Sequence, residues 1–375
     1  MTGRFGENCA ASMSIARPIV AGQMLCHSGA MAGQASAAMF SADTDFTTAL
    51  PFPVRPVPRV ATISAAEFRR SYRRREHPVI IEGAMKDWEA VARWSSPERL
   101  LELVDPARTV YCRQRTDLLG AYTEDYVATT FGDLLAEVFG PGTTPHYLTQ
   151  GLVFPARGRA QLLSRPQYPA LLEELAVDCR LPQLIDDSNL SEGVLWLGKG
   201  GQVTPLHFDA TENLNGTVCG RKRWVLFPPS EARHLLEPGN DGRGSVLGSI
   251  EKLMVDGAWT GGPVTHAFTC ETKPGEMLYL PAGYVHQVYS SDEPNMAVNF
   301  WFVEMTIPRI VLRQADTAAI RRFGYHQPAK RAVGIAILLA MALSMLASYG
   351  ALRGKIRPAT YALGPTDYSF KPRLW

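Results

Sequence analysis

TPLHFDATENLNGTVCGRKRWVLFPP, residues 204–229, places His207 and Asp209 two positions apart in an apolar, strand-like setting. Successive side chains of a strand point to opposite faces, so these two side chains share one face and Phe208 packs behind them. A neutral imidazole and a carboxylate are two of the three ligands in the 2-His-1-carboxylate triad, which holds Fe(II) and leaves coordination positions open. The stretch therefore predicts part of a metal site.

The third ligand is expected from residues 275–304, GEMLYLPAGYVHQVYSSDEPNMAVNFWFVE. His286 follows a strand-like run and a Pro-Ala-Gly turn, and it opens a further strand. An isolated His-x-Asp is more often a core histidine beside a solvated aspartate. A second histidine in a matching strand setting favours a metal site over this purely structural explanation.

Short apolar runs separated by glycine and proline turns predict a sandwich or barrel of strands. The expected strands of this core are 194–197, 203–208, 214–219, 224–227, 264–270, 277–280, 287–290 and 296–302. Upstream, a capping-box pattern, Ser64-x-x-Glu67, predicts a helix to about residue 74. Further elements are expected as helices at 89–94, 97–104, 131–139 and 169–177, and as strands at 78–81, 109–113 and 146–150. The fold class is mainly β with flanking helices.

Several motifs occur together in the predicted core: Thr-Pro-x-His-x-Asp, Asn213, Gly-Arg-Lys-Arg at 220–223 and Phe-Pro-Pro at 227–229. In this order they resemble the JmjC-type (cupin-8) Fe(II)/2-oxoglutarate dioxygenases. The similar subgroup contains the asparaginyl hydroxylase that inhibits hypoxia-inducible factor and the tRNA wybutosine hydroxylase. The similarity covers residues 78–304 and includes the segment HPVIIEGAMKDWEAVARW. It implies a double-stranded β-helix, the jelly-roll of cupins, that uses Fe(II), 2-oxoglutarate and O2.

The resemblance implies roles for eight residues. They are the metal ligands His207, Asp209 and His286; Thr204, Lys222 and Tyr147, around the distal carboxylate of 2-oxoglutarate; and Asn213 and Asn299, on the cosubstrate and oxygen side. The chemistry of the lysine agrees, because an inward-facing charge in a strand is costly unless it is paired. A dicarboxylate supplies that pair. The alternative is an outward-facing lysine beside Arg221 and Arg223.

The expected reaction is hydroxylation of a C–H bond, with release of succinate and CO2. A protein side chain is the favoured substrate, and a tRNA base or a small metabolite would also fit. Demethylation is less expected, since no reader domain or zinc cluster accompanies the core. Two readings from other classes stay open: a non-redox metal-binding cupin, as an isomerase or binding module, and a catalytically inactive scaffold.

Composition excludes some classes. The chain has 375 residues and a formal net charge of +2, which gives no case for a nucleic-acid-binding surface. Its six cysteines are scattered without a Cys-x-x-Cys pair, so neither a disulfide framework nor a zinc site is indicated. Cys219 and Cys270 lie in apolar runs and are predicted to be buried thiols, which favours a reducing compartment.

The sequence divides into five parts. Residues 1–58 are expected to be a disordered tail and a proline-rich linker, with an organelle transit peptide as the alternative for residues 1–50. The dioxygenase domain is expected at 59–310, with its core at 194–304. We also expect a basic linker or helix at 311–331 and a short tail at 351–375. These two segments lie on either side of a fifth part, residues 332–350.

Residues 332–350 contain the uncharged run AVGIAILLAMALSMLASY, which predicts a transmembrane helix at 332–350. Basic residues near its N-terminal end favour membrane anchoring with the catalytic domain in the cytosol. The alternative is a buried C-terminal helix in a soluble cytoplasmic protein. Some members of the resembled family form homodimers through such helices.

Overall fold

A computed structural model describes most of the chain between Phe40 and Phe302 and part of one later helix. The described residues are 40–115, 122–142, 146–151, 155–156, 159–160, 173–186, 189–209, 211–231, 235–237, 245–246, 248–302, 329, 332–337 and 339–340. Residues 1–39 of the predicted N-terminal tail and linker (1–58) lie outside them, as do the predicted tail 351–375 and the segment 311–331 apart from residue 329.

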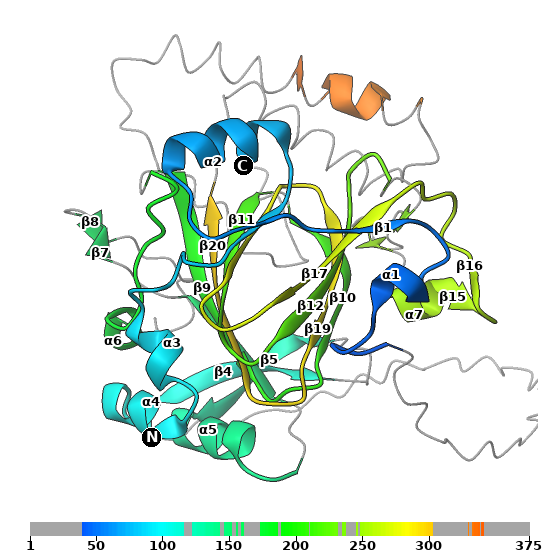
Figure 1. Cartoon of the computed structure of the whole chain (residues 1–375). Coiled ribbons are helices and arrows are strands. Elements are labelled where there is room, and N and C mark those ends of the chain that lie inside the picture. Colours follow the sequence, from blue (N-terminus) through cyan, green and yellow to red (C-terminus); the bar gives the residue numbers. More distant parts are fainter. Residues whose placement is uncertain are drawn as a thin grey trace, which may run out of the picture. The chain divides into compact units, whose positions relative to one another are not determined.

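The smaller of two main sheets has five strands (Figure 1). Their order is β1 (Val54–Pro56), β17 (Ala267–Thr272), β12 (Lys222–Phe227), β19 (Val285–Ser290) and β10 (Val203–Phe208). All neighbours pair antiparallel except β1 and β17, which are parallel.

The larger sheet has nine strands and faces the smaller one (Figure 1). Their order is β2 (Arg59–Val60), β3 (Val79–Ile81), β18 (Met277–Leu280), β11 (Glu212–Cys219), β20 (Asn295–Phe302), β9 (Leu190–Gly198), β6 (His146–Gly151), β4 (Thr109–Arg115) and β5 (Tyr122–Thr130). Along the chain, β9, β11, β18 and β20 join this sheet, whereas β10, β12, β17 and β19 join the smaller one. This alternation between two facing sheets is a jelly-roll, and the mainly β prediction is confirmed.

Period-two patterning decides which side chains lie between the sheets. On β12, Trp224 and Leu226 belong to the cluster shared with the larger sheet, whereas Val225 and Phe227 pack on the opposite face. On β18, Leu278 and Leu280 face inward in the same way. The two sheets thus hold each other through interdigitated apolar side chains, and each of these strands presents a buried second face.

Helices cover the outer face of the larger sheet. They are α2 (Ala65–Ser71), η1 (Arg73–Arg75), α3 (Glu89–Arg93), α4 (Pro97–Leu103), α5 (Phe131–Phe139) and α6 (Glu173–Ala176). The expected cap of α2 is present, because the Ser64 side chain accepts from the Glu67 N–H at 3.2 Å. Fully buried aromatic side chains such as Phe68, Trp94 and Phe131 join these helices to the sheet in one cluster.

Residues 40–58 correct the expectation of a disordered tail and linker. They form α1 (Phe46–Ala49) and β1, and the side chains of Phe40, Phe46 and Leu50 pack on the outer face of the smaller sheet. Asp45 caps α1 by accepting from the Thr47 N–H. The proline-rich stretch can pair because β1 is an edge strand, where a missing N–H is tolerated.

The remaining short elements border this same face or form small hairpins. They are α7 (Ile250–Leu253), β15 (Met254–Val255), β16 (Ala258–Trp259), β7 (Pro155–Ala156), β8 (Arg159–Ala160), β13 (Leu236–Glu237) and β14 (Ser245–Val246). The predicted buried thiols are confirmed, since Cys219 and Cys270 are both buried and free.

The predicted membrane span, 332–350, lies mostly outside the described residues. Residues 332–337 and 339–340 are helical, and 338 and 341–350 are not described. Across the part of the chain that the structure describes, no helix is both long and apolar enough to cross a bilayer. The orientation toward the cytosol and the homodimer stay predictions.

A buried ion pair ties η1 to β11, the strand that carries Asn213. The Arg73 Nε lies 3.1 and 3.2 Å from the two carboxylate oxygens of Glu212, and the Tyr279 hydroxyl donates to the same carboxylate at 2.7 Å. Glu212 is 4% exposed. Removing one member of such a pair strands the other charge in the interior.

We therefore expect Arg73→Ala to lower the free energy of unfolding by about 3–5 kcal/mol, measured by urea denaturation. Arg74→Ala is the matched control, because Arg74 is exposed on the same 3-10 helix. Equal losses in the two variants would show that the buried pair contributes nothing specific.

Candidate active site

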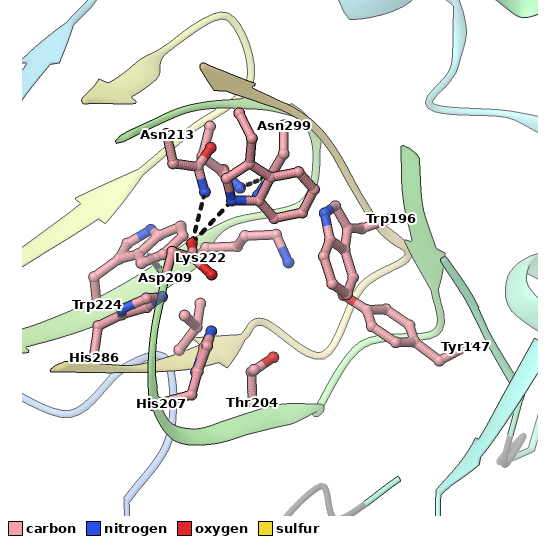
Figure 2. A pocket seen from close by; sticks show the side chains of 13 residues that line it. Tyr147, Trp196, Thr204, His207, Asp209, Asn213, Lys222, Trp224, His286 and Asn299 are labelled. Carbon is pink, nitrogen blue, oxygen red and sulfur yellow. Dashed lines mark hydrogen bonds between the residues drawn. The ribbon is translucent and has the colours of Figure 1, made fainter. Parts of the chain in front are cut away.

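One pocket between the two sheets gathers all eight residues singled out in the sequence. Its lining comprises Tyr147, Thr204, His207, Asp209, Asn213, Lys222, His286 and Asn299, together with Trp196, Asn215, Trp224, Val288 and Trp301 (Figure 2). Both sheets contribute, because the inward positions of β10, β12 and β19 face those of β6, β9, β11 and β20.

The two histidines meet across neighbouring strands. His207 on β10 and His286 on β19 are direct cross-strand partners, and their ring centroids lie 4.0 Å apart. The Nδ1 of His207 lies 2.8 Å from the Pro205 carbonyl oxygen, and that of His286 lies 3.0 Å from the Tyr284 carbonyl oxygen. A carbonyl only accepts, so each Nδ1 carries the proton and each Nε2 keeps its lone pair.

His286 is also held in its neutral form. It is 2% exposed, and burial, followed by the neighbouring His207, lowers the pKa of His286 well below its ordinary value. A metal requires the neutral imidazole, so this environment prepares the ring for ligation without prior loss of a proton.

Asp209 follows β10 directly and is buried. Its Oδ2 accepts from the Trp301 Nε1 at 3.0 Å and from the Asn213 Nδ2 at 3.3 Å (Figure 2). Its Oδ1 is also buried, yet it has no hydrogen-bond partner among the described residues. An unsatisfied carboxylate oxygen in the interior costs free energy unless a cation or donor completes it.

The side chains of His207, Asp209 and His286 are suitable ligands for a divalent metal, although they do not converge on one point in the structure. As placed, the described His, Cys, Asp and Glu side chains form no group of three or more that could hold a metal ion. The chemistry of His207, Asp209 and His286 nevertheless matches the facial triad: two imidazoles with lone pairs on Nε2 and one carboxylate with a spare oxygen. Ligation by all three requires a shift of these side chains toward a common point.

Lys222 is a buried cation that forms no ion pair with any described residue of the pocket. It is 5% exposed on β12, and its Nζ donates to the Ser290 hydroxyl at 3.3 Å. Burial lowers the pKa of Lys222 to about 8. Figure 2 shows Thr204 and Tyr147 near its ammonium, at the end of the pocket away from His286. This end offers donors to an anion.

Amide side chains line the larger-sheet wall. Asn213 and Asn215 share the inward face of β11, and Asn299 lies opposite Asn215 on β20. The Asn215 amide donates to the Asn299 oxygen. The wall therefore supplies neutral polar groups beside the carboxylate of Asp209, at a depth where charged ones would be costly.

Five lining residues were missed from the sequence, and four of them carried a usable signal. Asn215, Trp224, Val288 and Trp301 each lie two positions after a predicted site residue on the same strand. The period of a strand places them on the same inward face. Trp196 has no such neighbour, and nothing in the sequence alone indicated it.

Comparison with known proteins agrees with the mainly β, cupin-like fold. Residues 65–306 match the family described as the cupin-like domain. The tRNA wybutosine-synthesizing protein 4 of Neurospora crassa is 29% identical over 266 residues, which cover 67% of this chain and 20% of that protein. The human bifunctional peptidase and (3S)-lysyl hydroxylase JMJD7 is 28% identical over 269 residues, 60% of this chain and 77% of that protein.

Among solved structures, that of Escherichia coli ycfD aligns over 70% of this chain and 58% of its own at 16% identity and a TM-score of 0.38, too distant to carry an argument. The chain spans only about a fifth of the Neurospora protein's length. The family match covers well over half of the chain and contains every strand of the two main sheets except β1 and β2. The chain therefore belongs to the cupin-like JmjC domain family.

Proposed function

We propose that this protein is an Fe(II)- and 2-oxoglutarate-dependent oxygenase that hydroxylates a C–H bond. The observation that carries the proposal is the presence in one pocket of a facial-triad donor set and, beside it, a buried lysine with no ion pair among the described residues. A dicarboxylate with a 2-oxo acid end satisfies both: one end chelates a metal and the other neutralises the lysine.

Each residue has a role in this proposal. His207, Asp209 and His286 would hold Fe(II), and Asn213 and Trp301 orient the Asp209 carboxylate through their hydrogen bonds. When bound, the iron would supply the redox chemistry of the reaction. 2-Oxoglutarate and O2 would give succinate and CO2, with one oxygen atom of O2 entering succinate and the other entering the substrate.

The residues at the far end select the cosubstrate. Lys222 pairs with the distal carboxylate, and Thr204 and Tyr147 donate to it. A non-redox cupin has no use for this arrangement, because a buried lysine without a bound anion only lowers stability. The same observation speaks against an inactive scaffold.

The favoured substrate is a protein side chain. The human relative is named as a lysyl hydroxylase, which supports this class, whereas the name of the Neurospora relative supports a tRNA base. The near-neutral charge of this chain does not favour a polyanion, because nucleic-acid-binding surfaces are rich in lysine and arginine.

The test is succinate formation from 2-oxoglutarate by the full-length chain with Fe(II) and ascorbate. We expect slow turnover without substrate, lost in His207→Ala and kept in His77→Ala, a control at an exposed histidine outside the pocket. Binding of 2-oxoglutarate without turnover would mean that the oxygen step needs its substrate. Absence of both would refute the proposal.

A further inference from the structure

We infer that the indole N–H of Trp196 is a hydrogen-bond donor to the distal carboxylate of the cosubstrate and helps to select a dicarboxylate. The inference rests on the proposed function, because it assigns a further residue to the same pocket. It concerns a group that the sequence did not indicate and that lies on β9, outside the motifs of residues 204–229.

The first observation is an unsatisfied donor. The Trp196 Nε1 is buried and has no hydrogen-bond partner among the described residues. Two other tryptophans of the pocket are satisfied: the Trp224 Nε1 donates to the Thr272 hydroxyl at 3.1 Å, and the Trp301 Nε1 donates to Asp209 at 3.0 Å. Buried indole N–H groups normally find a partner, so Trp196 marks a position where an acceptor is missing.

The second observation is where this donor points. Figure 2 shows the nitrogen edge of the Trp196 indole turned into the pocket, toward the ammonium of Lys222. An indole N–H and an ammonium are both donors only, so neither satisfies the other. A carboxylate placed between them accepts from both, through two oxygens and about four lone pairs.

Neighbouring rings restrain the indole. Its ring centroid lies 5.7 Å from that of Tyr147 and 6.1 Å from that of Trp301. Both contacts come from the larger sheet, since Tyr147 is on β6 and Trp301 on β20, the two strands that flank β9. A donor held this way is oriented before the ligand arrives, which lowers the entropy lost on binding.

The consequence is selectivity for the distal carboxylate. A 2-oxo acid of the same length without that group, such as 2-oxovalerate, leaves the Trp196 N–H without an acceptor and the Lys222 ammonium without a counter-ion. Sites built to pair polar groups discriminate strongly against analogues that leave those groups unsatisfied. The tryptophan therefore contributes to the recognition of the dicarboxylate and not to the metal end of the molecule.

The experiment measures binding to the full-length protein loaded with Mn(II) in place of Fe(II), by calorimetry. We expect Trp196→Phe to raise the Kd for 2-oxoglutarate about tenfold to hundredfold, as for a lost hydrogen bond to a charged group. Its Kd for 2-oxovalerate should stay within about twofold of wild type. Trp224→Phe removes an indole from the same pocket whose N–H is already bonded, and it should change both Kd values by a common factor.

A second measurement uses the unmodified side chain. The Trp196 indole N–H resonance, identified by its absence from Trp196→Phe or, should that variant not fold, from Trp196→Tyr, should move downfield with 2-oxoglutarate and not with 2-oxovalerate. The resonance of Trp224 is the internal reference.

The outcomes separate the inference from the function on which it rests. Wild-type binding of 2-oxoglutarate with an unaffected Trp196→Phe and an unmoved resonance would overturn the inference and leave the oxygenase proposal intact. Failure of the wild type to bind 2-oxoglutarate would overturn both. Equal weakening of both ligands in Trp196→Phe would assign the residue to packing alone, which also overturns the inference.

Discussion

Lys222→Met will stabilise the protein in the absence of cosubstrate and will at the same time nearly abolish its binding of 2-oxoglutarate. Methionine resembles the lysine stem in size and needs no solvation. In the folded protein burial lowers the pKa of Lys222 from 10.5 to about 8. That difference corresponds to on the order of 3 kcal/mol of stability, at about 1.4 kcal/mol per pH unit. Loss of the buried charge should weaken 2-oxoglutarate binding by about 2–5 kcal/mol.

The stability gain depends on pH in a defined direction. Below pH 8 Lys222 is protonated in both the folded and the unfolded chain, so the wild type carries the full penalty. Between pH 8 and 10.5 the unfolded chain still holds a proton that the folded protein has released, so wild-type stability rises with pH. The advantage of Lys222→Met over wild type is therefore largest at pH 7 and shrinks across that window.

Urea denaturation of both proteins at pH 7 and pH 9.5 measures the first effect, and calorimetry with 2-oxoglutarate measures the second. Lys273→Met is the matched control, since its side chain is 60% exposed and its loss should change neither quantity appreciably. A destabilised Lys222→Met protein, or one that still binds 2-oxoglutarate tightly, would show that the ammonium is satisfied by the protein itself.

Asp209→Asn will remove metal binding while keeping the shape of the pocket. The amide can still accept from the Trp301 Nε1, but it lacks the charge that holds a divalent cation. Loss of a group that merely orients a ligand costs about 10–100-fold in metal affinity, so loss of a ligand should exceed about 100-fold. Succinate formation should fall below detection.

The measurement is the rise in melting temperature on adding Mn(II), compared between wild type and variant. Asp256→Asn is the control, because Asp256 is exposed outside the pocket and its positive φ of 50° suits asparagine equally well. If Mn(II) still raises the melting temperature of Asp209→Asn, Asp209 is excluded as a ligand, and only the two histidines of the predicted triad remain as candidate ligands.

The β core was predictable because its periodicity is local. The strands at 203–208 and 277–280 have the predicted bounds, and so does the helix at 131–139, where Thr130 caps the first turn. The structure differs from the prediction where an element is stabilised by a strand that is distant in the sequence. β1 is too short and too rich in proline to signal a strand by itself, and it pairs with β17, far along the chain. Only the tertiary partner decides its conformation.

The site shows the same division. The strand period brings Lys222 and His286 inward, and it would also have found Trp224 and Val288 two positions later. Trp196 lines the pocket because β9 faces β12 across it. This tertiary arrangement is not encoded in any local sequence pattern, so Trp196 could be identified only from the structure.

The pairing of β1 with β17 also constrains the order in which the chain assembles. Residues 40–56 emerge from the ribosome long before residues 267–272, yet their hydrogen bonds and apolar contacts lie on the sheet that those later residues complete. Pairing across so long a loop forms slowly, because closure entropy is lost before any contact compensates for it. We expect residues 40–56 to dock only after β17 has been made, which leaves Phe40 and Phe46 accessible to chaperones for most of synthesis.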